Sequence, residues 1–262
     1  RSLMKELTSI ALPLTLGGLI MPVSQLIDSA LVLNLVKAGD ATTLYGIWSG
    51  PVHSLLGLPV VLVGGVAAAV LPAISRAHVS ENKPLMDANI NSAIKLTNVI
   101  ALPCVLGFAC LSRQIVRLLY SALPEADLSL AGSLLALSSV SILFLALSGT
   151  CTSIMQGTGK IYYPLMFLGI FCIVKIALNL ILMPLEQINI YAFAISTTIC
   201  YLLSAALGLR FITRRQNVKI DVMQTFFKPL ACTLAMTVTL LLFSVFASDF
   251  VNTTLGTVTA IL

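Results

Sequence analysis

Eight apolar stretches divide the chain, and the basic residues are distributed very unevenly over the connections between them. Most of the Lys and Arg residues lie before the first stretch or in every second connection, whereas Lys37, Arg113 and Arg117 lie in the other connections and Lys175 lies inside a stretch. Because basic connections are retained on the cytoplasmic side, this asymmetry predicts a chain that starts in the cytoplasm and crosses a membrane repeatedly. The residues on the predicted cytoplasmic side are Arg1, Lys5, Arg76, Lys83, Lys95, Lys160, Arg210, Arg214, Arg215, Lys219 and Lys228.

Composition also indicates a membrane protein. The chain is 58% apolar and 10% charged, with a mean hydropathy of +1.02, whereas an average soluble domain is about 25% charged. The net charge of +5 comes without the aromatic–basic clusters that grip nucleic acid, so we expect no nucleic-acid partner. The cysteines all lie in apolar stretches without metal-type spacing, which predicts neither a disulfide nor a metal site. They are Cys104, Cys110, Cys151, Cys172, Cys200 and Cys232.

The apolar pattern predicts an all-α, polytopic transmembrane helical bundle. A short amphipathic helix is expected at the outer surface over Ser112–Tyr120, where Arg113 and Arg117 would meet lipid phosphates or form part of a gate. The last apolar run, Val251–Leu262, would reach only ~18 Å as a helix, short of the ~30 Å hydrocarbon core, so we expect this segment to be truncated. The predicted segments are 7–36, 44–74, 88–111, 128–155, 161–183, 188–212, 226–246 and 251–262.

Two charges lie at mid-bilayer depth in the predicted segments, Asp28 in the first and Lys175 in the fifth. A charge at the bilayer centre costs about 2.5–3.5 kcal/mol, so each should face a partner or a cavity. The rise per residue places Asp28 ~9 Å and Lys175 ~4 Å beyond the middle of their segments in the same direction. The two can therefore meet if both helices line one cavity. Gln25 shares the helix face of Asp28, and Asn179 shares that of Lys175.

Two interpretations of these residues are open. In one, Asp28 and Lys175 are a buried pair that fixes helix packing. In the other, they line a hydrated cavity in which Lys175 meets a substrate anion and Asp28 meets a coupled cation or the lysine itself. His53, near the start of the second segment, is either a further cavity residue or a hydrogen-bonded packing residue.

Five short strings occur together in a characteristic order. By these strings the chain resembles the polysaccharide-transporter and stage V sporulation protein B branch of the multidrug/oligosaccharidyl-lipid/polysaccharide (MOP) exporter superfamily, with the MurJ branch a more distant relative. The strings are Leu26–Val32, Leu44–Gly46 followed by Gly57–Pro59, Leu71–Arg76, Met155–Lys160 and Lys175–Asn179.

The resemblance implies a fold of fourteen helices, with two six-helix lobes around a central cavity and two extra helices. Residues 1–215 would then be the second lobe (family helices 7–12), and residues 216–262 would be helix 13 and part of helix 14. The first lobe would be missing. The MurJ branch carries an arginine shortly before its Leu-Pro string, but this chain reads His53-Ser-Leu-Leu-Gly-Leu-Pro59, so we expect Lys175 to supply the positive charge.

The resemblance also implies a function. The expected activity is movement of lipid-linked oligosaccharide, peptidoglycan or polysaccharide precursors across the bacterial cytoplasmic membrane by alternating access. No cofactor is expected, and coupling to Na+ or H+ is left open. The expected partners are a polyprenyl-pyrophosphate-linked glycan, the first lobe and membrane lipids.

Two other functions stay open, and one class is disfavoured. A multidrug–cation antiporter of the same superfamily would use Asp28 as its carboxylate, and a non-transporting role in envelope or spore assembly needs no substrate site. The connections are short and carry neither HExxH nor a paired acidic motif, so we expect a transporter and not an enzyme.

Overall fold

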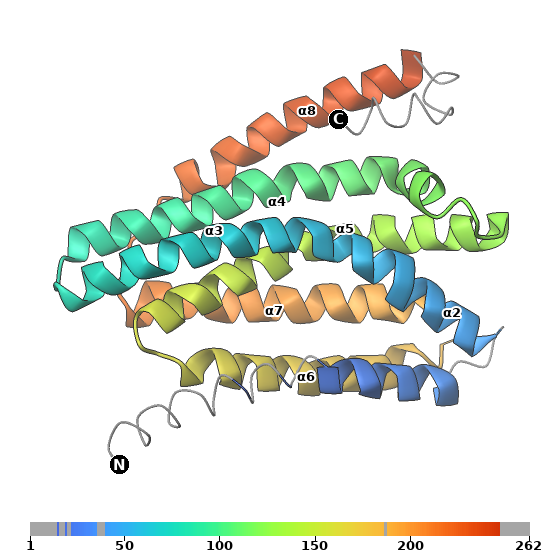
Figure 1. Ribbon diagram of the computed structural model, residues 1–262, viewed down its shortest axis with the longest axis horizontal. Coiled ribbons are helices and arrows are strands. Elements are labelled where there is room, and N and C mark those ends of the chain that lie inside the picture. The colour runs from blue at the N-terminus through green and yellow to red at the C-terminus, as the bar shows by residue number, and fades with distance from the viewer. Residues whose placement is uncertain (1–14, 16–18, 20–21, 36–39, 186–187, 247–262) are drawn as a thin grey trace.

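The computed structural model describes residues 15, 19, 22–35, 40–185 and 188–246, and every regular element in these residues is helical (Figure 1). Five of the described helical stretches are long and apolar enough to cross a membrane. The predicted all-α transmembrane bundle is therefore confirmed. The elements are a helix over residues 22–35, α2 (Ala41–Ile47), η1 (Trp48–Val52), α3 (His53–Val79), α4 (Lys83–Leu119), α5 (Glu125–Gly157), α6 (Tyr162–Leu182), α7 (Tyr191–Arg215), η2 (Met223–Phe227) and α8 (Lys228–Phe246).

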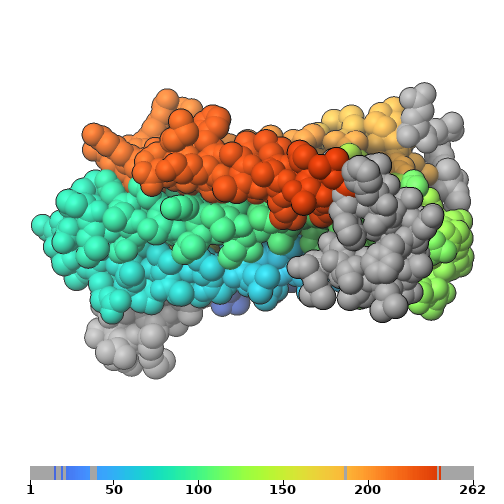
Figure 2. Space-filling model, turned by 90° about the horizontal axis from the view of Figure 1, so that it is seen from above, coloured from blue at the N-terminus to red at the C-terminus, as the bar shows by residue number. Residues whose placement is uncertain are grey.

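Helix α5 lies at the centre of the bundle, in contact with α3, α4 and α7 (Figure 1). Helix α6 packs on α7, and the helix over residues 22–35 runs beside α6 at one edge of the bundle. At the opposite edge α8 lies lengthwise against α4 (Figure 2). The helix over residues 22–35 and helix α8 thus lie on opposite sides of the helices that pack around α5.

Helix–helix contacts in this bundle combine buried apolar clusters with hydrogen bonds between small polar side chains, while many other large apolar side chains face outward. Val61 on α3 is 75% exposed. Between helices, Thr97 Oγ1 lies 2.7 Å from Thr150 Oγ1, and Ser148 Oγ lies 2.6 Å from Ser204 Oγ. Because lipid tails are as apolar as leucine, membrane helices associate through close packing and hydrogen bonds between small residues. The bundle has the outward-facing apolar surface that a bilayer requires.

The connections predicted to be cytoplasmic meet at one end of the bundle (Figure 1). Lys83 Nζ, at the start of α4, donates a hydrogen bond to the backbone oxygen of Gln216, at the end of α7. The Gln216 side chain in turn donates to Thr158 Oγ1, after α5, at 2.7 Å. Three successive basic connections therefore share one end, and the assignment of that end to the cytoplasm stays a prediction.

The second predicted segment, 44–74, is longer than expected and contains a bend. Asp40 caps α2, because its carboxylate accepts a hydrogen bond from the backbone N–H of Thr42 at 3.1 Å. Pro51 lies in the π-helical turn η1 between α2 and α3. Proline has no N–H for the helical ladder and displaces the preceding turn, which accounts for the wider turn. This turn directs residues of α2 and α3 toward the same interior space.

The amphipathic segment over Ser112–Tyr120 is helical, and a kink sets it apart from the third predicted segment. The label α4 covers both parts up to Leu119, but Leu111, the predicted end of the third segment, is non-helical (φ −107°, ψ 15°). Ile115 is buried while Arg113 and Arg117 are exposed, so the amphipathic character is confirmed. Segment 251–262 and the start of segment 7–36 lie outside the described residues. The division into residues 1–215 and 216–262 stays a prediction.

We expect Gly208→Ala to destabilise the bundle by about 1–3 kcal/mol, the usual cost of overpacking. A Cβ atom at Gly208 of α7 would lie 2.8 Å from Cys151 Cβ of α5, whereas one at Gly149 of α5 would meet nothing within 4 Å. The matched control Gly149→Ala should be neutral or slightly stabilising, since alanine favours helix. The free energy of unfolding in detergent checks this. Equal stabilities for the two variants would contradict the close α5–α7 contact.

Candidate functional site

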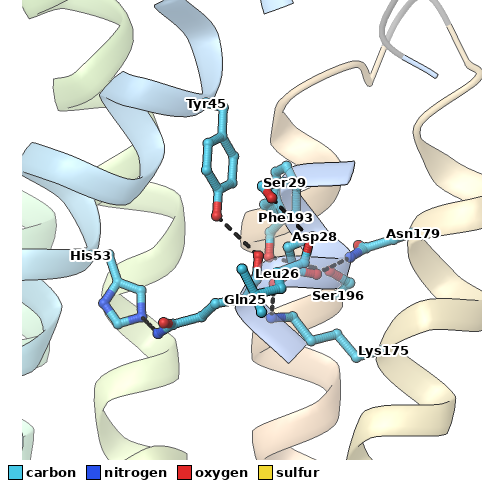
Figure 3. A network of polar contacts seen from close by, with 10 residues as sticks. All are labelled: Gln25, Leu26, Asp28, Ser29, Tyr45, His53, Lys175, Asn179, Phe193 and Ser196. Atoms are coloured by element: carbon cyan, nitrogen blue, oxygen red, sulfur yellow. Dashed lines mark hydrogen bonds and ion pairs between the residues drawn. The ribbon is translucent and has the colours of Figure 1, made fainter. Parts of the chain in front are cut away.

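Asp28 and Lys175 form an ion pair between the helix over residues 22–35 and α6 (Figure 3). Lys175 Nζ lies 2.5 Å from Asp28 Oδ2, and Asn179 Nδ2 donates a hydrogen bond to Asp28 Oδ1 at 3.0 Å. Lys175 and Asn179 are one helical turn apart, so both reach the same carboxylate. The structure thus brings together the two charges that the sequence left free to meet, with Asn179 on the same face as Lys175, and both oxygens of the carboxylate have partners.

The ion pair is buried in the bundle. Asp28 is 3% exposed, Lys175 8% and Asn179 0%. The Lys175 ammonium also lies 6.0 Å from the ring centroid of Phe171, one turn earlier on α6, at a distance that permits cation–π attraction. Since an isolated charge at this depth is costly, each group depends on the other for compensation.

The ion pair also fixes the helix over residues 22–35. Within this helix the buried side chains are Ser24, Asp28 and Val32, which are spaced four residues apart and form one stripe. Two of the three are polar, and Leu26 on the same helix is 70% exposed. The position of this helix therefore rests on polar contacts more than on apolar packing.

A cavity of about 160 Å³ adjoins the ion pair. Bulk water occupies ~30 Å³ per molecule, so this space corresponds to roughly five waters. Its walls come from the helix over residues 22–35 and from α2, η1, α3, α5, α6 and α7. The lining residues are Ser24, Gln25, Asp28, Tyr45, Trp48, Ser49, His53, Leu56, Gly57, Ser141, Leu145, Lys175, Thr197 and Tyr201.

A second polar cluster ties the same helix to α2 and α3 (Figure 3). The Tyr45 hydroxyl donates to the backbone oxygen of Gln25 at 3.1 Å, and Gln25 Nε2 lies 3.4 Å from His53 Nε2. Gln25 and His53, both predicted as cavity residues, do line the cavity. Their roles in binding stay predictions.

The cavity contains hydrogen-bonding capacity that the described protein groups leave unused. Ser24 Oγ and Thr197 Oγ1 are buried and line the cavity, and neither has a hydrogen-bond partner among the described residues. Buried hydroxyls are normally satisfied, so these two atoms indicate a place for water or for a polar ligand. Within the described part of the chain, no group of three His, Cys, Asp or Glu residues could hold a metal ion.

Two predicted site residues lie elsewhere, and several cavity residues were missed. Arg113 and Arg117 are exposed beyond the α4 kink and do not line the cavity, so their surface or gate role stays a prediction. Thr197 and Tyr201 of α7 were not identified, although their spacing of four places both on one helix face. Trp48 was missed because its direction depends on the π-helical turn, for which apolar periodicity gives no signal.

Comparison with known sequences gives a consistent family assignment. The sequence model of the family described as lipid II flippase MurJ matches residues 1–259. Among proteins of Bacillus subtilis (strain 168), the chain is 28% identical to the lipid II flippase MurJ over 216 residues, which cover 80% of this chain and 39% of that protein. It is 26% identical to the uncharacterized membrane protein YabM over 225 residues, covering 84% and 40%. The chain thus spans about 40% of the length of these two curated relatives.

Solved structures show the same fold. The inward closed conformation of lipid II flippase MurJ matches with a TM-score of 0.73 at 19% identity, covering 91% of this chain and 48% of that one. MATE in the bent conformation matches with a TM-score of 0.69 at 14% identity, covering 94% and 55%. A MOP superfamily transporter from Pyrococcus furiosus also reaches 0.69, at 13% identity, covering 93% and 54%. The predicted MOP-superfamily fold is confirmed.

Mutations of the ion pair should be strongly non-additive. Lys175→Met alone leaves the Asp28 carboxylate buried without compensation, at an expected cost of about 3–5 kcal/mol. Asp28→Asn combined with Lys175→Met removes both charges and should cost less than the sum of the single changes. A double-mutant cycle on the free energy of unfolding in detergent measures this coupling. Additive effects would show that the two charges do not stabilise each other.

Proposed function

The chain belongs to the lipid II flippase MurJ family, and on that premise we propose that it forms one wall of the path along which a lipid-linked glycan precursor crosses the bacterial cytoplasmic membrane. The cargo class is a polyprenyl-pyrophosphate-linked oligosaccharide or a peptidoglycan or polysaccharide precursor. The end of the bundle that carries the basic connections faces the cytoplasm in this proposal. A further lobe supplies the opposite wall, in keeping with the greater length of the relatives.

One observation carries the proposal: a buried ammonium group borders a polar cavity inside an apolar bundle. Lys175 lines the same cavity as Ser24 and Thr197, whose hydroxyls have no hydrogen-bond partner among the described residues. A lipid-linked glycan has a pyrophosphate and a sugar head that need a polar route, whereas its polyprenyl tail stays in lipid. A lysine ammonium is a mobile point charge without the bidentate fork of arginine, so it can hold a phosphate and release it again.

The described conformation is too narrow to hold the cargo. A cavity of about 160 Å³ is smaller than the ~300–1,000 Å³ of ordinary small-molecule sites, and a glycan pyrophosphate requires more. Lys175 is also occupied by Asp28. In the proposed cycle, the helix over residues 22–35 moves away from α6, the cavity widens, and the ammonium exchanges Asp28 for a substrate phosphate. Re-formation of the pair then releases the phosphate.

The lining offers no uncompensated carboxylate to an organic cation. An antiporter for cationic drugs needs an uncompensated carboxylate, but Asp28 is neutralised by Lys175 within the same wall. A purely structural role would leave the unpartnered cavity hydroxyls without a function. The transport experiment described next distinguishes the antiporter and the structural role from the proposed function.

We expect Lys175→Ala to lower flipping of a fluorescent polyprenyl-pyrophosphate glycan about 10- to 100-fold, the cost of one charge-assisted contact to phosphate. The assay uses the full-length protein in proteoliposomes. Lys95→Ala, which removes an exposed lysine on α4, should flip at the wild-type rate. Because Lys175→Ala leaves Asp28 uncompensated, Asp28→Asn with Lys175→Ala provides a second inactive variant with a better chance of folding.

Three results would count against the proposal. If the folded Lys175→Ala variant flipped the glycan at the wild-type rate, Lys175 would have no role in the transport path. Transport of cationic dyes by the wild-type protein in place of the glycan would favour the antiporter. Normal cell growth with a folded but transport-inactive protein would favour a structural role.

A further inference from the structure

We propose that the Lys175 ammonium fills the cation position of the Asp28 carboxylate, so that the wild-type site binds no Na+ and Lys175 determines the ion specificity of the path. This inference rests on the proposed function only in placing the ion pair on the transport path. The binding claim itself concerns the buried site alone and can be tested without a substrate.

The cavity that the ammonium lines contains further oxygen atoms. Ser24 and Thr197 line it with their hydroxyls, and Asn179, whose Nδ2 donates to Asp28, carries another buried oxygen, Oδ1. None of these three oxygens has a hydrogen-bond partner among the described residues, so none is hydrogen-bonded to the ammonium. Hard cations are bound by carboxylate and other oxygen ligands, and the Asp28 carboxylate is the charged group here that would attract one.

The place such a cation would take is already occupied. Lys175 Nζ lies 2.5 Å from Asp28 Oδ2, so the ammonium occupies the position in which a cation would contact that oxygen. Asn179 engages the other carboxylate oxygen at 3.0 Å. Each oxygen of the carboxylate already has a partner, and its charge is already compensated, so the residues present do not fit a resident Na+ ion.

Charge leads to the same conclusion. Asp28 and Lys175 together carry no net charge, so a second cation would meet the ammonium without an uncompensated carboxylate to balance it. Without the ammonium, a cation ~4 Å from the carboxylate in a medium of effective dielectric constant ~20 would gain an attraction that strengthens binding roughly a thousandfold, and the ammonium cancels this gain. The tethered ammonium is always present at the site, and the ion pair forms at any sodium concentration.

Removing the ammonium should convert the site into a Na+ site. In Lys175→Ala the Asp28 carboxylate would line the cavity without a compensating cation, in company with the hydroxyls of Ser24 and Thr197. The melting temperature of the detergent-purified full-length protein is compared in NaCl and in N-methylglucamine chloride at equal ionic strength. We expect no difference for the wild type, and for Lys175→Ala a rise in NaCl of about 3 °C, the effect of a ligand at roughly ten times its Kd.

Two variants control for nonspecific salt effects. Asp28→Asn with Lys175→Ala lacks the carboxylate and should show no rise in NaCl. Lys95→Ala removes an exposed lysine from α4 and should behave as the wild type. A rise confined to the single Lys175 variant therefore assigns the sodium site to Asp28.

A wild-type melting temperature that rises in NaCl and loses this rise in Asp28→Asn would overturn the proposal. So would a folded Lys175→Ala variant without a sodium response. If Lys175→Ala does not fold, the sodium-dependent change in melting temperature is compared between the wild type and Asp28→Asn. This comparison still tests whether the wild-type Asp28 site binds Na+. Since no substrate is present, a protein that shows the expected sodium pattern but flips no glycan contradicts the proposed function and leaves the ion assignment intact.

Discussion

The ion pair between Asp28 and Lys175 determines where the helix over residues 22–35 lies. This helix buries a single stripe of three side chains, two of them polar, and Leu26 on the same helix is 70% exposed. Lipid solvates apolar side chains as well as protein does, so apolar contacts alone would not hold this helix against α6. The carboxylate–ammonium–amide cluster supplies the specific attraction, and its burial makes loss of either charge costly.

The rest of the lobe is held differently, and this difference suits a moving part on a fixed body. Helix α5 contacts α3, α4 and α7 through a buried apolar core, through the close approach of Gly208 to Cys151, and through hydroxyl pairs such as Thr97–Thr150. Close packing of this kind resists displacement because interiors repack only in discrete steps. A polar cluster can instead exchange partners with an anionic ligand at small net cost. The alternating-access motion therefore has its natural site between the helix over residues 22–35 and α6.

Sequence reasoning showed that Asp28 and Lys175 could meet, but it left open whether they pair and gave no shape for the cavity. The constant rise of an α-helix made the depths of the two charges countable, and the spacing of Lys175 and Asn179 placed them on one face. The break at Leu111 lies where the third predicted segment ends, because the hydropathy pattern changes there. The π-helical turn at Trp48–Val52 was not predicted, because it depends on how neighbouring helices accommodate Pro51, whereas hydropathy shows only which residues prefer lipid.

The central claim is that Lys175 exchanges Asp28 for a phosphate of the cargo. A cryo-electron microscopy structure of the full-length protein in lipid nanodiscs, with a bound polyprenyl-pyrophosphate glycan, tests it most directly. The account predicts a phosphate oxygen within ~3 Å of Lys175 Nζ, a hydrogen-bonding distance, and an Asp28 carboxylate that has left the ammonium. An intact Asp28–Lys175 pair, with the pyrophosphate held by other residues, would contradict it.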